Sequence, residues 1–411
     1  MQTTLSDELR TTPEGEIAEG ILRSCVHCGF CLATCPTYQI LGNELDSPRG
    51  RIYLIKQVFE GHAPTAKTQL HLDRCLTCRS CETTCPSGVE YGKLLDIGRA
   101  LVEAQVGRTR LDWLRRRTLK TLIPNPRLFT PLLKLGQRMR PFMPGTLKAK
   151  IPAPSASSRP ELPATGHPRK MLLLEGCAQP ALAPDINAAA TRVLDRLGIT
   201  LFAAPAAGCC GAVAHHLNDQ DGGLDAMRRN IDAWLTHLDA GVEAIVMTAS
   251  GCGVMVKEYG WHLRHDPAYA DKAERVSAAT KDLSEVLLAE SDTRGALPAS
   301  HAAHRKVAFH SPCTLQHGQK IRGVVESLLA AAGYELSPVT DEHLCCGSAG
   351  TYSLTQPNFS RQLRDNKLAA LSASSTVVFV TANIGCQTHL QGGTKIPVRH
   401  WIELIDELIG E

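Results

Sequence analysis

The sequence predicts an α+β protein of several domains, in which a helical N-terminal region precedes two repeated α/β units. Three observations lead to this expectation. One cysteine motif occurs twice before residue 90, a set of four cysteines occurs twice after residue 170, and short apolar runs alternate with amphipathic stretches around that second set. At 411 residues and 43% hydrophobic content, the chain is long and apolar enough for more than one core.

The N-terminal motif is Cys25–Pro36, Cys-Val-His-Cys-Gly-Phe-Cys-Leu-Ala-Thr-Cys-Pro, and its second copy is Cys75–Pro86. Both read C-x2-C-x2-C-x3-C-P. Three closely spaced thiolates ligate one [4Fe–4S] cluster, and in two-cluster ferredoxins the Cys before Pro ligates the other cluster. The first predicted cluster therefore has the ligands Cys25, Cys28, Cys31 and Cys85. The second has Cys75, Cys78, Cys81 and Cys35.

Two other uses of these cysteines are structural zinc and a disulfide framework. Zinc sites usually pair two C-x2-C turns and need neither the third Cys nor the Cys-Pro ending. Disulfides are rare in a reducing compartment. All 16 cysteines fall in the two patterned sets, and the N-terminus shows no export signal, so the sequence favours metal ligation.

Helical spacing links and follows the two motifs. Apolar residues at 52, 55, 58 and 59 follow a Ser-Pro-Arg-Gly start and predict a helix, and Val89–Val106 predicts another. Arg49 and Arg51 lie at the start of the first of these helices. They either tune the potential of the two anionic clusters by their charge or occupy a solvated helix N-terminus.

The segment from Gln105 to Lys170 holds 15 Lys and Arg residues against two acids, although the whole chain has a net charge of only +3. Within it, Leu111–Ile123 combines an apolar stripe, Trp113 and the run Arg115–Arg117. A basic amphipathic helix of this kind suits an anionic membrane surface or an acidic partner, and the alternative is a helix packed on this chain's own domains. Residues 141–168, rich in Pro, Ser and Ala, are expected to form a linker.

No apolar run approaches eighteen residues, so no membrane-spanning helix is expected. The predicted location is the cytoplasm, with peripheral contact at the cytoplasmic face of the inner membrane through residues 107–140 left open.

From Lys170 onward the chain repeats itself. Cys177, the pair Cys209-Cys210 and Cys252 match Cys313, the pair Cys345-Cys346 and Cys386. The first interval is 32 residues in both copies, and the second is 42 in one copy and 40 in the other. Both pairs are followed by Gly, which lets the backbone come close to a bulky inorganic ligand. These eight cysteines are candidate ligands for additional metal.

Each single Cys follows a short apolar run, which predicts a buried strand. The runs are Met171–Leu174, Ala244–Met247, Val307–Phe309 and Val377–Val380. Amphipathic helices are expected at about 184–197, 222–238, 318–332 and 358–372. This alternation predicts parallel sheets, whose ligands gather beyond the carboxyl ends of the strands, where these cysteines fall.

The repeats resemble the cysteine-rich (CCG) domains of heterodisulfide reductases and related oxidoreductases. Joined to a double-cluster ferredoxin region, the whole chain resembles the family of bacterial glycolate oxidase iron–sulfur subunits. Three phrases carry this resemblance: Ser47-Pro-Arg-Gly-Arg-Ile, Cys209-Cys-Gly-Ala-Val-Ala-His-His, and Ser311-Pro-Cys-Thr-Leu-Gln-His-Gly-Gln. The fold class it implies is a helical double-cluster ferredoxin-like domain followed by two repeated α/β CCG domains.

We expect the domain boundaries 1–106, 107–168, 169–292 and 304–411. One departure from the family pattern concerns its closing C-x2-C, since Met255 and His389 stand where the fifth Cys would be. A four-Cys cluster, an empty site and a disulfide therefore remain alternatives in each repeat.

The resemblance implies an electron-transfer subunit that receives electrons from FAD on partner glycolate oxidase subunits and passes them to an acceptor, in the first place a quinone. The chain itself shows no G-x-G-x-x-G fingerprint for a flavin or nicotinamide, and no nucleic-acid partner is expected. No catalytic residue is assigned. Several histidines are either proton donors to a quinone or ordinary core and surface residues: His215, His216, His310, His317, His343 and His389.

Other functions stay open at this stage. A related subunit of a glycerol-3-phosphate or lactate dehydrogenase would carry the same motifs. A thiol–disulfide enzyme of the heterodisulfide reductase type would use the C-terminal cysteines without any hydroxy acid. A redox sensor or a cluster-storage protein would not turn over at all.

Overall fold

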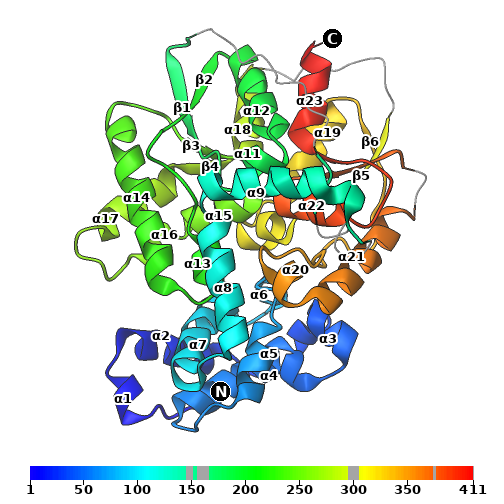
Figure 1. Cartoon of the computed structure of the whole chain (residues 1–411). Helices are drawn as coiled ribbons and strands as arrows, with labels where there is room; N and C mark the ends of the chain where they lie inside the picture. The colour runs from blue at the N-terminus through cyan, green and yellow to red at the C-terminus, as the bar shows by residue number, and fades with distance from the viewer. Residues whose placement is uncertain (145–150, 155–165, 295–304, 374–375, 411) are drawn as a thin grey trace. The chain divides into compact units, whose positions relative to one another are not determined.

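The computed structural model describes residues 1–144, 151–154, 166–294, 305–373 and 376–410, which form two compact units (Figure 1). Unit 1 comprises Met1–Arg117 and His343–Leu363, and unit 2 comprises Thr118–Glu342 and Arg364–Glu411. The predicted fold class is confirmed, with a helical N-terminal region followed by two α/β repeats. The four domain boundaries stay predictions, and most of the expected linker lies outside the described residues.

Unit 1 is helical in its described residues. Its N-terminal helices are α1 (Asp7–Arg10), α2 (Pro13–Ser24), α3 (Pro36–Leu41), α4 (Pro48–Phe59), α5 (Ala66–Asp73), α6 (Ser80–Thr84) and α7 (Tyr91–Val106), with the short turns η1 (Phe30–Leu32) and η2 (Glu44–Asp46). Helix α20 (Tyr352–Thr355) and the start of α21 (Pro357–Leu371) complete it, and α8 (Arg110–Leu122) begins in it.

The predicted helix between the motifs is α4. Its N-cap Ser47 accepts a hydrogen bond from the backbone N–H of Gly50, and Pro48 stands in the first turn, where no intrahelical N–H bond is lost. The buried face of α4 includes Ile52, Ile55 and Phe59, which pack with Leu94 and Leu95 of α7 in one core cluster. Both motifs are thereby held on one apolar core.

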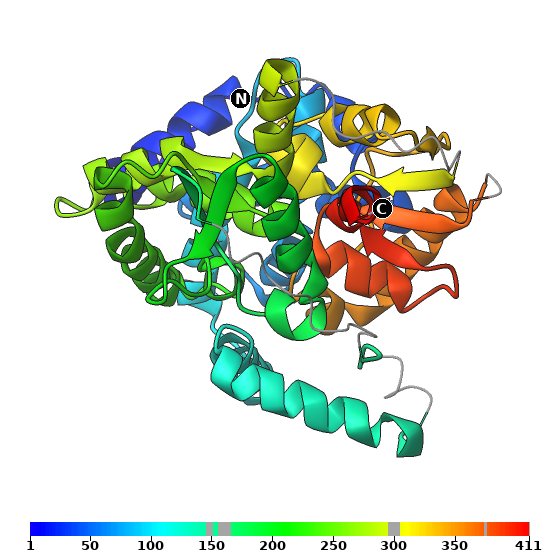
Figure 2. The ribbon, with the colours of Figure 1, turned by 90° about the horizontal axis from the view of Figure 1, so that it is seen from above.

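Unit 2 contains two parallel sheets with the same strand order, seen from above in Figure 2. The first sheet, in the order β2-β1-β3-β4, consists of β2 (Ile199–Ala203), β1 (Arg169–Leu173), β3 (Ile245–Met247) and β4 (Thr280–Asp282). The second, in the order β6-β5-β7-β8, consists of β6 (Glu335–Leu336), β5 (Lys306–His310), β7 (Val378–Thr381) and β8 (Val398–His400). The equal order confirms that the cysteine repeat is a structural repeat.

The helices of unit 2 follow the strands as the alternation predicts. In the first repeat they are α11 (Gln179–Leu182), α12 (Asp185–Arg196), α13 (Ala212–His216), α14 (Gln220–Asp239), α15 (Ser250–Lys257), α16 (Tyr259–His262), α17 (Ala270–Ala279) and α18 (Leu283–Arg294). In the second they are the π-turn η4 (Thr314–Gly318), α19 (Val324–Ala331), α22 (Ile384–Gln391) and α23 (Trp401–Gly410), with the end of α21. Helix α9 (Pro126–Met139) and the turn η3 (Arg140–Phe142) precede the first sheet.

Two expectations differ from the structure in detail. The helix expected from residue 318 begins at Val324, because Thr314–Gly318 forms a π-turn and Gly323 adopts a left-handed conformation before the helix. The sequence analysis predicts no strand at β2, β4, β6 or β8, which are the edge strands of the two sheets.

The two repeats share one core in unit 2. Apolar residues of β1 and α12 cluster with those of β5 and α23, and Arg192 of α12 pairs with Asp406 of α23. The turns that carry the cysteines also meet: Ser250 Oγ lies 2.8 Å from Thr314 Oγ1, and the N–H of Ser250 donates to the carbonyl of Ala382. The repeats therefore fold as one body.

Candidate metal centres

The N-terminal cysteines collect in two pockets of unit 1. The first, site 1, is lined by Cys25, Cys28, Cys31 and Cys85, together with Cys81. The second, site 2, is lined by Cys35, Cys75, Cys78 and Cys81. The fourth Cys of each motif thus lines the pocket formed by the other motif. This geometry agrees with the crossed sets expected from the sequence, and the ligand assignment itself stays a prediction.

Residues with a left-handed backbone conformation shape these two pockets. In the first motif His27 (φ 56°) and Gly29 (φ 86°) stand between the cysteines, and Thr77 (φ 53°) and Arg79 (φ 60°) occupy the same positions in the second. One such residue in each two-residue spacer reverses the backbone, so that successive Cys side chains point inward. Non-glycine residues adopt this conformation at a cost of roughly 1–2 kcal/mol each, and such strain clusters at ligand sites.

The thiol environment fits a metal cluster. Burial raises the pKa of Cys31 to about 11 and also raises the pKa of Cys25, so both free thiols are protonated at neutral pH. Thiolates are the ligating form, and binding of metal releases these protons. A site with four sulfur donors suits a soft metal or an iron–sulfur cluster.

Site 2 contains a buried cation. Arg51 is 1% exposed, donates to the carbonyl of His71 at 2.7 Å and to Thr37 Oγ1 at 3.1 Å, and lines the pocket. Asp46, which is fully buried, lies 3.6 Å from Arg51 and 2.9 Å from Arg74. The sequence analysis treats Arg49 and Arg51 as a pair, but in the structure they belong to different sites. Arg49 lines site 1 and pairs with Glu44 at 2.8 Å.

The four cysteines of the first C-terminal repeat meet in unit 2. A chain of side-chain hydrogen bonds joins Cys177 to Cys209, Cys209 to Cys210, and Cys210 to Cys252. The pKa of Cys209 is lowered because Cys177 and Cys210 donate to its sulfur, and the pKa of the two donors is raised accordingly. Cys209 therefore ionises more readily than Cys177 or Cys210.

Buried polar groups hold the Cys209–Cys210 loop in place. Asn230 of α14 accepts from the N–H of Gly208 at 2.8 Å and donates to the carbonyl of Cys209 at 3.0 Å. Tyr259 donates its hydroxyl to the carbonyl of Cys210 at 2.8 Å. Gly211 closes the turn with φ 93°, and a Cβ there would lie 2.9 Å from the carbonyl oxygen of Gly223. The glycine after the pair is thus required by geometry.

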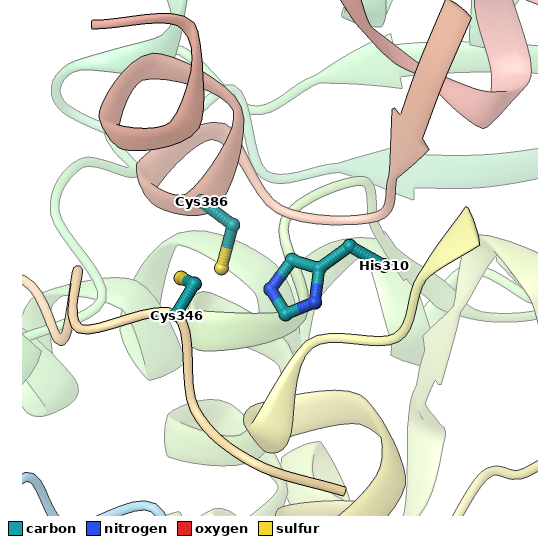
Figure 3. A group of neighbouring side chains, drawn as sticks. All are labelled: His310, Cys346 and Cys386. Atoms are coloured by element: carbon teal, nitrogen blue, oxygen red, sulfur yellow. The ribbon is translucent and has the colours of Figure 1, made fainter. Parts of the chain in front are cut away.

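The second repeat differs by a histidine. Figure 3 shows His310 at the end of β5 near Cys386 of α22, and the ligand atoms of these two residues of unit 2 lie within 4.8 Å of one another. His310 is 2% exposed, and among the described residues neither ring nitrogen has a hydrogen-bond partner. Burial lowers its pKa well below the usual value, so the imidazole is neutral and able to ligate. The matching position of the first repeat is Leu174.

Sequence reasoning missed several of these groups. Asn230 and Tyr259 lie far along the chain from the cysteines that they support, and no motif marks them. His310 was named only among scattered histidines. A signal for it existed in the alignment of the two repeats, where a histidine stands opposite a leucine three residues before the first Cys.

The comparisons with known proteins agree with this arrangement. A family model described as a 4Fe-4S dicluster domain matches residues 21–89, and one described as a cysteine-rich domain matches residues 171–257 and 307–391. The glycolate oxidase iron–sulfur subunit of Escherichia coli is 55% identical over 100% of this chain and 99% of its own length. The chain belongs to the glycolate oxidase iron–sulfur subunit family. The expected resemblance and the iron–sulfur domains are thus confirmed.

Other relatives are more distant. A probable glycolate oxidase iron–sulfur subunit of Bacillus subtilis is 31% identical over 95% of both chains. Lactate utilization protein A of Bacillus licheniformis is 28% identical over 58% of this chain and 99% of its own. A hypothetical protein from Helicobacter pylori shares the fold with a TM-score of 0.57 at 10% identity, covering 98% of this chain and 73% of that chain. Among the described residues of this family member, no helix is long and apolar enough to cross a membrane.

Proposed function

We propose that this chain is the electron-transfer subunit of a complex that oxidises glycolate to glyoxylate, in which FAD on a partner subunit gives up two electrons and a quinone accepts them. The observation that carries the proposal is the pair of adjacent cysteine-lined pockets, which share Cys81 as a lining residue, in a chain that is 55% identical to a glycolate oxidase iron–sulfur subunit. Two neighbouring one-electron sites are what a relay between two-electron partners needs.

In this proposal Cys25, Cys28, Cys31 and Cys85 hold one [4Fe–4S] cluster, and Cys75, Cys78, Cys81 and Cys35 hold the other. Each cluster accepts and releases single electrons when it is bound. The protein's own contribution is to position the thiolates and to supply the surrounding charge. Arg51, buried beside Cys35 and Cys75, stabilises negative charge at site 2.

The repeats extend the relay. Cys177, Cys209, Cys210 and Cys252 form one proposed ligand set, and Cys313, Cys345, Cys346 and Cys386 form the other. The hydrogen-bonded thiols of the first set and the neutral His310 of the second support metal binding at both. The two sets offer different donors, so their metal content need not be the same.

The test is made in the assembled complex, with the partner subunits co-expressed. Replacing Cys209 and Cys210 by Ser, or Cys345 and Cys346 by Ser, should abolish glycolate-dependent quinone reduction while assembly and the two N-terminal clusters persist. Two missing thiolates of four leave a cluster without enough ligands. A variant that assembles and turns over at the normal rate would confine electron transfer to sites 1 and 2.

Peripheral contact with the cytoplasmic face of the inner membrane is the second part of the proposal. Helix α9 and the turn η3 carry an exposed apolar row: Leu128, Leu132, Leu135, Met139 and Phe142, which are 44–89% exposed. Arg127, Lys134 and Arg138 are exposed and follow each other at helical spacing beside this row. An apolar stripe flanked by cations is the pattern of a helix that lies in an anionic lipid surface.

The inner side of α9 packs on the chain itself. Gln137 donates to the carbonyl of Ala153, and Arg140 donates to the carbonyl of Ile151. Figure 2 shows α9 at the periphery of unit 2. In α8, Arg115 and Arg116 both pair with Asp112. The proposed membrane contact is therefore the exposed face of α9 and not the arginine run of α8.

A further inference from the structure

The two cysteine pockets of unit 1 differ in their access to solvent. Site 1 is lined by exposed residues, among them Cys28, Val26 (66% exposed) and Phe30 (63% exposed). Every residue that lines site 2 is buried or half-buried. Because tunnelling rates fall steeply with distance, a redox partner that docks from solvent exchanges electrons more readily with site 1.

The two pockets also differ in charge. At site 2, Arg51 is buried and lines the pocket, and Arg99, which is 8% exposed, donates to the carbonyl of Cys75 at 2.8 Å. Arg74 precedes Cys75, and Asp46 is the acid that faces Arg51 and Arg74. Arg79 also lines the pocket and pairs with Glu82 at 2.9 Å. Four guanidinium groups against two carboxylates leave an excess of positive charge in a region of low dielectric.

Site 1 has a smaller and more solvated excess. Arg49, which lines it, is paired with Glu44. The amino group of Met1 donates to the carbonyl of Cys25 at 2.5 Å, and its bond to the carbonyl of Arg23 is exposed to solvent. Charges near water are screened far more strongly than buried ones. An added electron is therefore held more favourably at site 2.

Site 2 is connected to the second cysteine pair within unit 1. Tyr352, 6% exposed, donates its hydroxyl to the carbonyl of Arg74 at 3.1 Å, and Arg74 is bonded to Cys75. The guanidinium of Arg74 also lies over the ring of Phe359, 5.3 Å from its centroid. Burial raises the pKa of Tyr352, and the negative charges of Cys75 and Cys345 act in the same direction. Tyr352 thus contacts the residue before Cys75 and follows the Cys345–Cys346 pair by six residues within unit 1.

We infer that electrons enter unit 1 at site 1, are held at site 2, and leave toward the Cys345–Cys346 pair past the Arg74 carbonyl and Tyr352. The inference rests on the proposed function, to which it adds a direction and a positioning residue. Each transfer removes one electron from site 1 and adds one to site 2, with no bond made or broken. The reductant is the reduced flavin of the partner, and the oxidant is the iron–sulfur group proposed at the second repeat.

The order of the two sites is tested by a redox titration of the full-length protein followed by EPR, with dithionite as reductant and Cys35→Ser to identify the site 2 signal. The electron should prefer site 2 by at least tenfold, which is about 59 mV for a one-electron couple. Arg99→Gln should narrow this gap, whereas Arg49→Gln at site 1 should not. Equal potentials, or a higher potential at site 1, would overturn the inference even if neither variant folds.

The exit path is tested with Tyr352→Phe, which keeps the ring and removes the hydrogen bond. The rate at which electrons leave site 2, followed by rapid-freeze EPR, should fall several-fold while both midpoint potentials stay unchanged. Tyr53→Phe, at an exposed tyrosine of α4, is the control. An unchanged rate with Tyr352→Phe would exclude this path. Failure of the wild-type complex to oxidise glycolate would contradict the proposed function instead, because the titration needs no glycolate.

Discussion

The side-chain amide of Asn230 donates to the carbonyl of Cys209 at 3.0 Å and accepts from the N–H of Gly208 at 2.8 Å, across more than twenty residues of sequence. Asn230 is fully buried in α14. Both ends of one amide therefore hold the backbone on the two sides of the Gly208–Cys209 peptide bond. The position of the Cys209 and Cys210 thiols depends on this residue.

Replacing Asn230 by Ala should lower the free energy of unfolding by about 1–3 kcal/mol, the cost of leaving buried backbone groups unpaired. It should also reduce the iron content of the first repeat. Urea denaturation and iron analysis measure the two effects. Thr236→Ala, at an exposed position of the same helix, is the matched control and should change stability by less than about 0.5 kcal/mol. A stability equal to that of the wild type would exclude the bracing role.

Gly211→Ala and Gly347→Ala should each destabilise the protein by at least about 1 kcal/mol, because the native φ is positive at both positions and a Cβ would clash with a carbonyl oxygen. The added Cβ would lie 2.6 Å from the oxygen of Ser360 in the second case. Gly20→Ala in α2 meets nothing within 4 Å and should be neutral or stabilising. Thermal unfolding of the three variants measures the effect. Equal melting temperatures would show that the positive φ and the Cβ clash do not limit these two glycine positions.

His400 should make stability fall at acid pH. Burial lowers its pKa from 6.5 to about 4, because the ring is fully buried, and this outweighs the contact of its Nε2 with the carbonyl oxygen of Thr248 at 2.9 Å, which favours the protonated form. Between pH 6.5 and pH 4 His400 is protonated in the unfolded chain and neutral in the folded chain. Its contribution to the free energy of unfolding is therefore full above pH 6.5 and is lost as the pH falls toward 4. The loss is on the order of 3 kcal/mol from this group.

His400→Gln should flatten this part of the stability curve, as measured by urea unfolding between pH 7 and pH 4. His62→Gln, at an exposed position, serves as control and should leave the slope unchanged. If the slope of the His400 variant equalled that of the wild type, another group would be responsible for the acid sensitivity.

Cys35→Ser should damage the cluster of Cys75, Cys78 and Cys81 and leave the other largely intact, because Cys35 lines site 2 although it belongs to the first motif. Cys85→Ser is the mirror experiment and should affect site 1. EPR with iron counting distinguishes the two. Loss of the Cys25 cluster in the Cys35 variant would show that each motif ligates its own cluster.

Leu132→Ser with Leu135→Ser should weaken sedimentation with vesicles of phosphatidylglycerol and phosphatidylcholine, since these residues lie at the centre of the exposed row of α9. Lys134→Gln with Arg138→Gln should weaken it as well, and more at low salt, because exposed charges are screened over about 10 Å at 0.1 M. Leu133→Ser, on the half-buried side of α9, controls for loss of the helix. Equal sedimentation of all variants would show that another surface, or a segment covering this row, decides the contact.

Some features could be predicted because they depend on local spacing alone. The C-x2-C-x2-C-x3-C-P motifs indicated which cysteines converge, since three thiols at every third residue of a tightly wound backbone reach one volume. The 32-residue interval and the alternation of apolar runs with helices predicted two parallel α/β repeats, because each strand and helix is recognised by its own periodicity. The edge strand β6 was not predicted, because two residues are too few to show a periodicity.

Tertiary structure decided what depends on residues that are far apart in the chain. The burial of Arg51 beside site 2, the amide of Asn230 against Cys209 and the neutral His310 beside Cys386 all follow from how helices and strands pack, and no local pattern marks them. The sequence by itself determined the kind of chemistry, since thiolate spacing selects the metal group. Only the fold decided the charge and solvent access around each site, because low dielectric and paired charges arise from packing.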